Sequence, residues 1–357
     1  MEIQENNLDS QTVSTKLDRI AEMAAKNKSM VFTALFHHLN EELLRQAYTL
    51  VRKDGATGID KVSGEQYAAN LEGNLKDLYL RLKDKRYRAP MVRRVRIPKA
   101  DGGERALGIP TFEDKIVQRA VAMLLEPVYE QDFCDCSYGF RPKRSAHQAL
   151  AVLRERCEEM DVQWVLDADI KSYFDTIPHT LLQDIVRERV NDGNIIRLIG
   201  KWLHTGVVDL GQITYPETGT PQGGVISPLL ANIYLHTVLD TWFLQEVLPR
   251  LKGRAFLVRY ADDFVIGFER EDDARKVYEV LPKRFEKYGL TIHPDKTRLR
   301  RFGKPQNDDH DSETFDLLGF THYWGKTRKG SWVIKRQTMR KRLCRAAKGA
   351  WAWSPSC

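Results

Sequence analysis

The chain has 357 residues, of which 42% are hydrophobic, and its formal net charge is +7 at pH 7. This length allows two or three subdomains with cores of their own, and the positive charge favours a polyanionic partner, although a merely basic soluble protein has the same balance. The five cysteines form no CxxC pair and no metal-binding spacing with histidine, which argues against a disulfide framework and a zinc site and favours free thiols. We find neither a signal peptide nor an apolar run of about 20 residues, so we expect a cytoplasmic protein without a membrane segment.

The first element along the chain that carries candidate functional side chains is a β-hairpin predicted over residues 91–110. Alternating apolar residues flank an Asp-Gly-Gly turn at residues 101–103. Lys99 and Arg105 would face each other across this hairpin, where a forked guanidinium and a compact ammonium suit the oxygens of a triphosphate. A solvated basic edge that prevents aggregation is the structural alternative.

A loop that mixes aromatic and basic residues is predicted at residues 137–145. Its sequence is Ser-Tyr-Gly-Phe-Arg-Pro-Lys-Arg-Ser, and its cations are Arg141, Lys143 and Arg144. Aromatic rings beside cations suit stacking and phosphate contacts with single-stranded nucleic acid. A packed aromatic loop with a solvated basic rim is the alternative.

Two apolar stretches end in carboxylates. Residues 164–168 read as a strand that stops before Asp169, and residues 256–268 read as a hairpin with Asp262 and Asp263 at its tip. If these strands are neighbours, the three acids lie together, where they would repel one another unless a cation is bound. Mg²⁺ suits a few carboxylates plus substrate phosphates, and two such ions promote in-line displacement at phosphorus. Taken alone, the paired acid also fits an ordinary surface turn.

A glycine-rich loop lies between these acids, at residues 219–224. Glycines let the backbone approach a ligand closely, and the amide of Gln222 is placed to contact a nucleotide or a template. A plain turn before a long helix is the alternative. Apolar periodicity further predicts helices over residues 181–203 and 271–288, and short strands at 290–293 and 315–320.

Taken together, these stretches resemble a reverse transcriptase, and most closely the group II intron reverse transcriptase/maturase family. The resemblance covers the chain from about Gly55 to about Arg340. It rests on Asp169-Ile170-Lys171-Ser172-Tyr173-Phe174-Asp175, Gly219-Thr220-Pro221-Gln222-Gly223-Gly224 and Tyr260-Ala261-Asp262-Asp263. Ser137-Tyr138-Gly139-Phe140-Arg141-Pro142, the stretch 289–297 and Leu317-Leu318-Gly319-Phe320 agree with it.

The resemblance implies an α+β fold, a right-hand polymerase with fingers, an antiparallel palm sheet packed on helices, and an incomplete thumb. Its parts would be an N-terminal extension at 1–50, fingers at 51–160, a palm at 161–330 with a finger insertion at about 183–222, and a basic thumb stub at 331–357. Lys335 and Arg336 would begin the thumb helix and contact nucleic acid. A family member of full length continues through a helical thumb and a maturase domain. Because a thumb keeps the enzyme on its template, the thumb stub leads us to expect a polymerase of low processivity.

The resemblance also implies a catalytic set. Asp169, Asp262 and Asp263, with the backbone at Ile170, would bind two Mg²⁺ ions, with Mn²⁺ as an alternative. Lys296 stands where related polymerases place a lysine near the leaving pyrophosphate, although a lysine on a surface turn fits the same position. The ions would activate the 3′-hydroxyl of the primer.

The nucleotide would be contacted by Lys99, Arg105, Phe174, Gln222 and Ala261. In reverse transcriptases the residue at the place of Phe174 lies under the sugar of the incoming nucleotide, where a large ring leaves no room for a 2′-hydroxyl. A core phenylalanine is the alternative at this position.

The expected function is therefore that of an RNA-directed DNA polymerase, a nucleotidyltransferase that extends a DNA or RNA primer on an RNA template with deoxynucleoside triphosphates. Group II intron RNA is the expected partner. The alternatives are a non-catalytic RNA-binding splicing cofactor and an inactive remnant. The absence of a maturase region argues against splicing, and the presence of all three acids argues for polymerisation.

Overall fold

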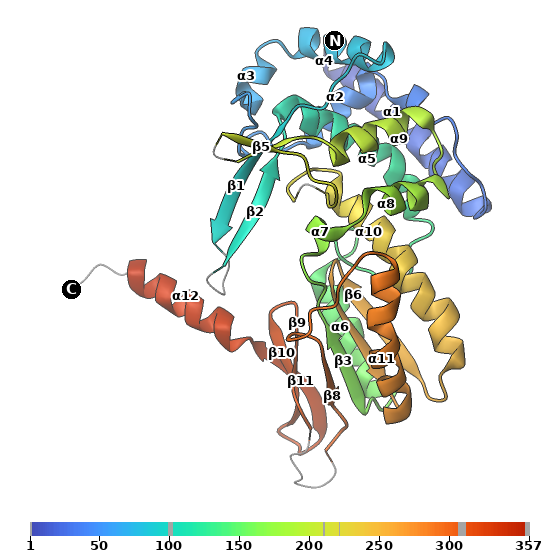
Figure 1. Ribbon diagram of the computed structural model, residues 1–357, viewed down its shortest axis with the longest axis vertical. Helices are drawn as coiled ribbons and strands as arrows, with labels where there is room; N and C mark the ends of the chain where they lie inside the picture. Colours follow the sequence, from blue (N-terminus) through green and yellow to red (C-terminus); the bar gives the residue numbers. More distant parts are fainter. Residues whose placement is uncertain (1, 99–102, 210, 221, 306–311, 354–357) are drawn as a thin grey trace. The chain divides into compact units, whose positions relative to one another are not determined.

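A computed structural model describes residues 2–98, 103–209, 211–220, 222–305 and 312–353 of the chain (Figure 1). The chain forms two compact units, each assembled from separate stretches of sequence. The first unit comprises Met1–Ile97, Glu104–Phe133 and Phe174–Tyr234, and the second comprises Pro98–Gly103, Cys134–Tyr173 and Leu235–Cys357. The fold is of the α+β class, as predicted. None of the helices in the described ranges is long and apolar enough to cross a membrane.

Helices packed around α5 make up most of the first unit. Helix α5 (Phe112–Tyr129) begins at Thr111, whose side chain accepts a hydrogen bond from the Asp114 amide, and it is buried on nearly every side. Helices α1 and α2 pack against it. The helices of this unit are α1 (Glu2–Lys26), η1 (Phe36–His38), α2 (Glu41–Leu50), α3 (Gly64–Ala68), α4 (Leu71–Lys83), α5, α8 (His179–Arg187) and α9 (Gly193–Leu203). Two further helices, α7 (Tyr173–Thr176) and α10 (Ser227–Leu235), have one end in each unit.

The sheet of the first unit has the strand order β2-β1-β4-β5. Strands β1 (Val92–Pro98) and β2 (Glu104–Ile109) are the arms of the predicted hairpin, which is confirmed as a strand pair. Its turn, including Lys99, lies outside the described residues. Strands β4 (Val207–Asp209) and β5 (Gln212–Thr214) extend the sheet, and β4 runs parallel to β1 with Val92 opposite Val207.

The second unit is built on an antiparallel sheet with the order β6-β7-β3-β8. These strands are β6 (Ala255–Tyr260), β7 (Asp263–Phe268), β3 (Trp164–Ala168) and β8 (Arg298–Arg301). Because side chains alternate between the faces of a strand, successive residues of one strand enter different cores. A strand whose two faces are both buried therefore needs a continuous apolar run, which explains the stretches 164–168 and 256–268.

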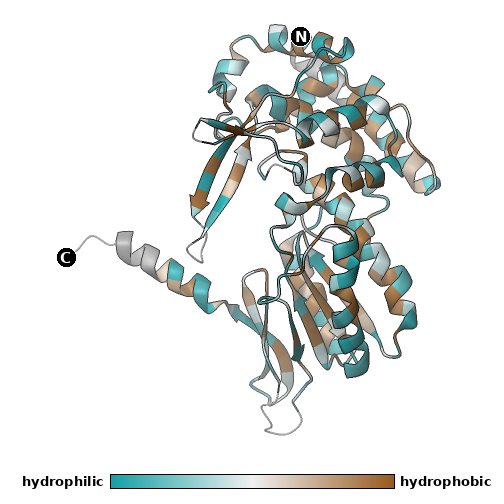
Figure 2. Ribbon diagram, viewed as in Figure 1, coloured by the Kyte–Doolittle hydropathy of each residue, from teal (hydrophilic) through white to brown (hydrophobic). Residues whose placement is uncertain are grey.

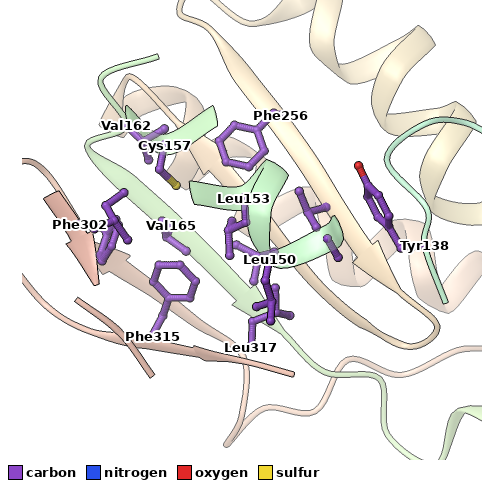
Figure 3. Packing of buried hydrophobic residues seen from close by; sticks show 14 residues of the cluster. Tyr138, Leu150, Leu153, Cys157, Val162, Val165, Phe256, Phe302, Phe315 and Leu317 are labelled. Carbon is purple, nitrogen blue, oxygen red and sulfur yellow. The ribbon is translucent and has the colours of Figure 1, made fainter. Parts of the chain in front are cut away.

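Helix α6 (Ala146–Glu159) covers one face of this sheet and α11 (Glu271–Lys287) packs against the other. On the α6 face, Leu150 and Leu153 join Val165, and the core continues to Phe302 and Phe315 (Figure 3). On the α11 side the ring of Phe285 stacks on Phe264, with centroids 6.0 Å apart. Helix α11 itself is largely hydrophilic along its length (Figure 2). A π-helical segment, η2 (His236–Val247), and the short η3 (Leu248–Arg250) follow α10, where the sequence predicts one continuous helix.

A three-stranded antiparallel sheet, β9 (Phe315–Leu317), β10 (Phe320–Lys326) and β11 (Trp332–Thr338), precedes α12 (Arg340–Trp353). The single strand predicted at 315–320 is wrong, because Leu318 and Gly319 adopt positive φ angles of 52° and 85° and form a turn. Lys335 and Arg336 were expected in a helix, but they lie in β11 opposite Tyr323 and His322. The run Trp-Val-Ile at 332–334 favours this strand, and its pairing with β10 outweighs the helix propensity of the basic residues.

Two other predicted elements differ in detail. The helix predicted over 181–203 is divided into α8 and α9, because Asp192 caps the second helix by accepting hydrogen bonds from the amides of Asn194 and Ile195. The strand predicted at 290–293 is reduced to one bridge between Ile292 and Ile170. That bridge nevertheless brings a distant segment to the end of β3.

Candidate active site

The tip of the β6–β7 hairpin carries two of the predicted acids. The predicted hairpin is confirmed, and because Tyr260 pairs with Asp263, its loop consists of Ala261 and Asp262 while Asp263 begins the second strand. Ala261 is buried and has a φ of 58°, the left-handed conformation that tight hairpins demand and that a residue with a side chain rarely adopts. The surrounding structure therefore holds this loop in a strained shape, with Asp263 exposed at the start of β7.

The third acid lies beside this tip. Strand β3 pairs with β7 and ends with Ala168 opposite Phe264, so Asp169 directly follows the last paired residue of β3 and Asp263 directly precedes Phe264 in β7. The predicted neighbourhood of the two acidic strands is confirmed. Burial raises the pKa of Asp167 to about 7, Arg300 opposes that shift, and the negative charges of Asp316, Asp263 and Asp169 add to it. Several carboxylates thus act on one small region at this end of the sheet.

Lys296 is the cation that accompanies these acids. Its Nζ donates to Oδ2 of Asp169 at 2.7 Å, and the two side chains are 57% and 23% exposed. The backbone fixes this approach, since the His293 amide donates to the Asp169 carbonyl and the Lys171 amide to the Thr291 carbonyl, both at 2.8 Å. Sequence proximity could not predict this contact, because 127 residues separate the partners.

The same two hydrogen bonds determine where the backbone of Ile170 points. They flank the bridge between Ile170 and Ile292, so these two residues form a non-hydrogen-bonded antiparallel pair. The amide and carbonyl of Ile170 are consequently directed away from Ile292, and its buried side chain anchors the strand end.

The donor set suits a hard divalent cation. Among the described residues, no three Asp, Glu, His or Cys side chains converge closely enough to form a ready-made metal cage. Mg²⁺ seldom needs one, because it keeps several waters and takes a few carboxylates together with substrate phosphates. The ammonium group on Asp169 shows that this carboxylate attracts positive charge. The residues present therefore fit Mg²⁺ bound jointly with a phosphorylated substrate.

A buried ion pair supports the hairpin tip, and sequence analysis missed it. The guanidinium of Arg259 donates to both carboxylate oxygens of Asp240, at 2.7 and 2.5 Å, and both side chains are 0% exposed. Its remaining arm donates to the Ala261 carbonyl at 3.0 Å. Arg259 thus connects the π-helical segment η2 to the strained loop. An arginine inside an apolar strand is the signal that could have revealed it, since a buried charge needs a partner.

The loop at 137–140 lies along the edge strand β6. The Tyr138 amide donates to the Arg259 carbonyl at 2.9 Å, and the Arg259 amide donates to the Cys136 carbonyl at 2.8 Å. A Cβ atom added at Gly139 would lie 2.4 Å from the Ala261 amide nitrogen, so only glycine fits there without displacing backbone. This loop therefore supports the hairpin tip from the side.

The basic residues of the loop have different surroundings. Arg141 is buried, and its guanidinium donates to the carbonyls of Cys134 and Ser137 at 2.7 and 2.8 Å, which favours a role in holding the loop. Arg144 pairs with Asp135 at 2.6 Å, whereas Lys143 is exposed. Contacts of these three cations with nucleic acid stay a prediction.

Three of the candidates for nucleotide binding, Arg105, Phe174 and Gln222, belong to the first unit, whereas Ala261 belongs to the second. The Thr220 amide donates to the Phe174 carbonyl at 2.7 Å, and the Gly108 amide of β2 donates to the Gln222 carbonyl at 2.5 Å. The glycine-rich loop is thus tied both to Phe174 and to the strand that carries the exposed Arg105. Lys99 is outside the described residues, so its part in this group stays a prediction.

The two cations predicted for the thumb lie on β11 and are exposed. Lys335 donates to the Lys326 carbonyl at 2.7 Å, and the Arg336 guanidinium lies 5.7 Å from the centroid of the Phe320 ring. Their contact with nucleic acid stays a prediction.

Acidic side chains at the hairpin tip of an antiparallel sheet, with a third acid on the neighbouring strand, are typical of enzymes that transfer nucleotidyl groups with divalent metal ions. Residues 97–322 match the family described as reverse transcriptase (RNA-dependent DNA polymerase). The chain belongs to this family, in its group II intron reverse transcriptase/maturase branch, and the predicted resemblance is confirmed.

Individual relatives differ in how much of their length is matched. Protein YkfC of Escherichia coli is 37% identical over 288 residues, which cover 71% of this chain and 75% of YkfC. Group II intron-encoded protein LtrA of Lactococcus lactis is 38% identical over 64% of this chain, which spans 38% of LtrA. Nuclear intron maturase 2 of Arabidopsis thaliana is 35% identical over 38% of this chain, which spans 24% of that protein.

Proposed function

We propose that this protein is an RNA-directed DNA polymerase of the group II intron type, which extends a primer on an RNA template. The observation that supports the proposal is the pairing of β3 with β7, because Asp169 follows the last paired residue of β3 and Asp262 and Asp263 stand at the tip of the hairpin that contains β7. In this proposal the second unit is the palm of a right-hand polymerase, the first unit contains the fingers, and α12 is part of a thumb.

The residues at and near the hairpin tip have two tasks, to hold divalent ions and to stabilise the charge on the leaving group. Asp169, Asp262 and Asp263 are the carboxylates that would hold divalent ions, with the Ile170 carbonyl as a further donor. Two Mg²⁺ ions bound there supply the charge that favours attack of a primer 3′-hydroxyl on an α-phosphate and departure of pyrophosphate. Lys296 adds an ammonium group on the same carboxylate, where it stabilises negative charge on the leaving group.

Arg259 and Asp240 act as positioning residues. They touch no substrate in this proposal, but they hold the Ala261 carbonyl and so keep the loop, together with Asp262, in its strained conformation. Preorganisation of this kind matters because a site loosened by about 1 Å loses much of its rate.

Selection of the nucleotide is assigned mainly to residues of the first unit. Phe174 would present its ring to the sugar and exclude the 2′-hydroxyl, with its backbone fixed by the glycine-rich loop. Arg105 and Lys99 would meet the triphosphate, and Gln222 would contact the nucleotide or the template. The proposed polyanionic partners are an RNA template, a DNA or RNA primer and, by analogy with the group II intron-encoded protein LtrA, group II intron RNA. Such a protein would work in the cytoplasm.

Primer extension with Asp263→Asn tests the proposal. The substitution is nearly isosteric but removes a charged metal ligand, so we expect extension on an RNA template to fall at least 100-fold, with the melting temperature and RNA affinity unchanged. Glu279→Gln, an exposed carboxylate on α11, is the matched control and should extend at the wild-type rate. Full activity in Asp263→Asn would contradict the site assignment.

The same experiment separates the second candidate function. The similarity to Nuclear intron maturase 2 of Arabidopsis thaliana supports a second candidate, a splicing cofactor that binds RNA without polymerising. If the wild-type protein binds intron RNA but extends no primer under any divalent ion, the splicing role is the better reading of the site.

A further inference from the structure

A groove between α8 and α9 in the first unit has a strongly one-sided charge. Its volume is about 630 Å³. The lining residues that the structure describes include no carboxylate and no Phe, Tyr or Trp. The polar side chains that line it are Gln183, Arg187, Asn191, Arg197, Lys201 and His204. A groove of this composition favours an anion and offers no ring for stacking a base, apart from one imidazole.

Within the residues that the structure describes, no carboxylate pairs with Arg197 or Lys201, although the Lys201 ammonium donates to the Tyr87 carbonyl. The buried Nε of Arg197 has no hydrogen-bond partner in the part of the chain that the structure describes, and one arm of this guanidinium donates to the Asn194 side chain at 3.2 Å. Burial lowers the pKa of Lys201, and the positive charges of Arg197 and Arg88 lower it further. Neighbouring cations that repel one another are stabilised by a bound polyanion.

Arg187 is the cation of the lining that has a carboxylate partner. It pairs with Asp184 at 2.7 Å, but the two side chains are 40% and 65% exposed, so this bond is weak in water. Arg187 can therefore exchange its partner for a phosphate at little cost.

The donors on α9 form a row. Arg197, Lys201 and His204 stand four and three residues apart, which sets them on one face of the helix at steps of about 6 and 4.5 Å along its axis. A compact free phosphate is best held by donors that converge on one point. A line of donors instead suits the repeated phosphates of a nucleic acid strand, and phosphate contacts of this kind do not depend on base sequence.

We propose that the α8–α9 groove binds the phosphodiester backbone of RNA, in addition to the carboxylate site on the second unit. The inference rests on the proposed function for its choice of RNA as the polyanion. It assigns Arg197 and Lys201 as the main phosphate contacts, with Arg187 and His204 beside them.

The test is RNA binding by the full chain carrying Arg197→Gln and Lys201→Gln together. Fluorescence anisotropy with a labelled RNA hairpin, in EDTA and without nucleotides, gives the dissociation constant at several salt concentrations. Loss of two phosphate contacts should weaken binding about ten-fold near 0.15 M salt and reduce the slope of log affinity against log salt by about 1.5. Thermal melting should be unchanged.

The matched control removes two charges elsewhere. Lys276→Gln with Lys283→Gln takes the same charge from exposed positions on α11 and should leave the salt slope within about 0.3 of the wild-type value. An unchanged slope in the groove variant, or an equal change in the control, overturns the proposal.

Further measurements identify the anion and distinguish this proposal from the proposed polymerase function. If the groove variant loses affinity for inorganic phosphate or for deoxyadenosine triphosphate while RNA binding is unchanged, the groove is a small-anion site and the proposal is wrong. Primer extension on a saturating short template should be retained by the groove variant. A wild-type protein that never extends a primer contradicts the proposed function but leaves the groove measurement valid, because that measurement needs no catalysis.

Discussion

Removal of one charge from the buried Arg259–Asp240 pair should be among the most damaging single changes in the chain. In Asp240→Asn the guanidinium keeps its full charge at 0% exposure but loses its anionic partner. Breaking a buried pair by removing one member costs about 3–5 kcal/mol, since an uncompensated charge remains in the interior. That is a large part of the roughly 5–15 kcal/mol by which proteins of ordinary stability are folded.

Urea denaturation followed by circular dichroism measures this loss. With a slope of about 3 kcal/mol per molar urea, the midpoint of the transition that involves the second unit should fall by about 1–1.7 M. Asp272→Asn is the matched control. Its partner Arg270 is 51% exposed, so the midpoint of the urea transition should stay at the wild-type value.

A double variant separates the two tasks of the pair. Asp240→Leu with Arg259→Met removes both charges and should regain most of the lost stability. The rate of primer extension should nevertheless stay below that of the wild type, because the double variant lacks the guanidinium that donates to the Ala261 carbonyl. A single variant as stable as the wild type would refute the charge argument, and a double variant with full activity would refute the positioning role.

Three further changes have outcomes that the structure determines. Phe174→Val should admit ribonucleotides at least ten-fold more readily in single-nucleotide extension, and unchanged discrimination would leave Phe174 as a core residue. Gly139→Ala should cost about 1–3 kcal/mol and slow extension, because the new methyl group meets backbone at 2.4 Å, whereas Gly55→Ala, with its nearest neighbour 3.8 Å away, should change neither. Burial raises the pKa of Asp114 from 3.8 to about 6, so the folded state binds this proton more tightly than the unfolded state does. The protonated carboxyl therefore contributes to the free energy of unfolding in full below about pH 4, and the contribution is lost as the pH rises through about 6. The unfolding free energy of the wild type relative to Asp114→Asn should therefore fall by up to about 3 kcal/mol between pH 4 and pH 7, and a constant difference would show that Asp114 does not titrate as described.

The acid-bearing strands could be predicted from sequence because their signal is local. Continuous apolar runs at 164–168 and 256–268 reflect burial on both sheet faces, and the register then follows from where each run ends. The predicted helix over 271–288 is found as α11, which begins and ends within one residue of those limits and is followed by Gly289 with a φ of 68°.

The features that escaped prediction depend on partners far away in the sequence. Lys335 and Arg336 look helical among their basic neighbours, and only pairing with β10 makes them part of a strand. The contact between Lys296 and Asp169 and the support of Ala261 by Arg259 each need a tertiary fold before they exist. Local patterns therefore predicted the strands that position the candidate acids, but not the ion pairs that hold these strands and their tip.

The interleaving of the two units has a consequence for how the chain is made. The central strand β3 ends at Ala168, yet its neighbours β7 and β8 are completed only at residues 268 and 301. During synthesis at about 5–20 residues per second, an apolar strand must wait several seconds without a partner on either edge. The first unit likewise needs α8 and α9, which come after β3 in the sequence. Neither unit can be excised as one continuous fragment, so limited proteolysis or a split expression strategy has no single boundary at which to cut.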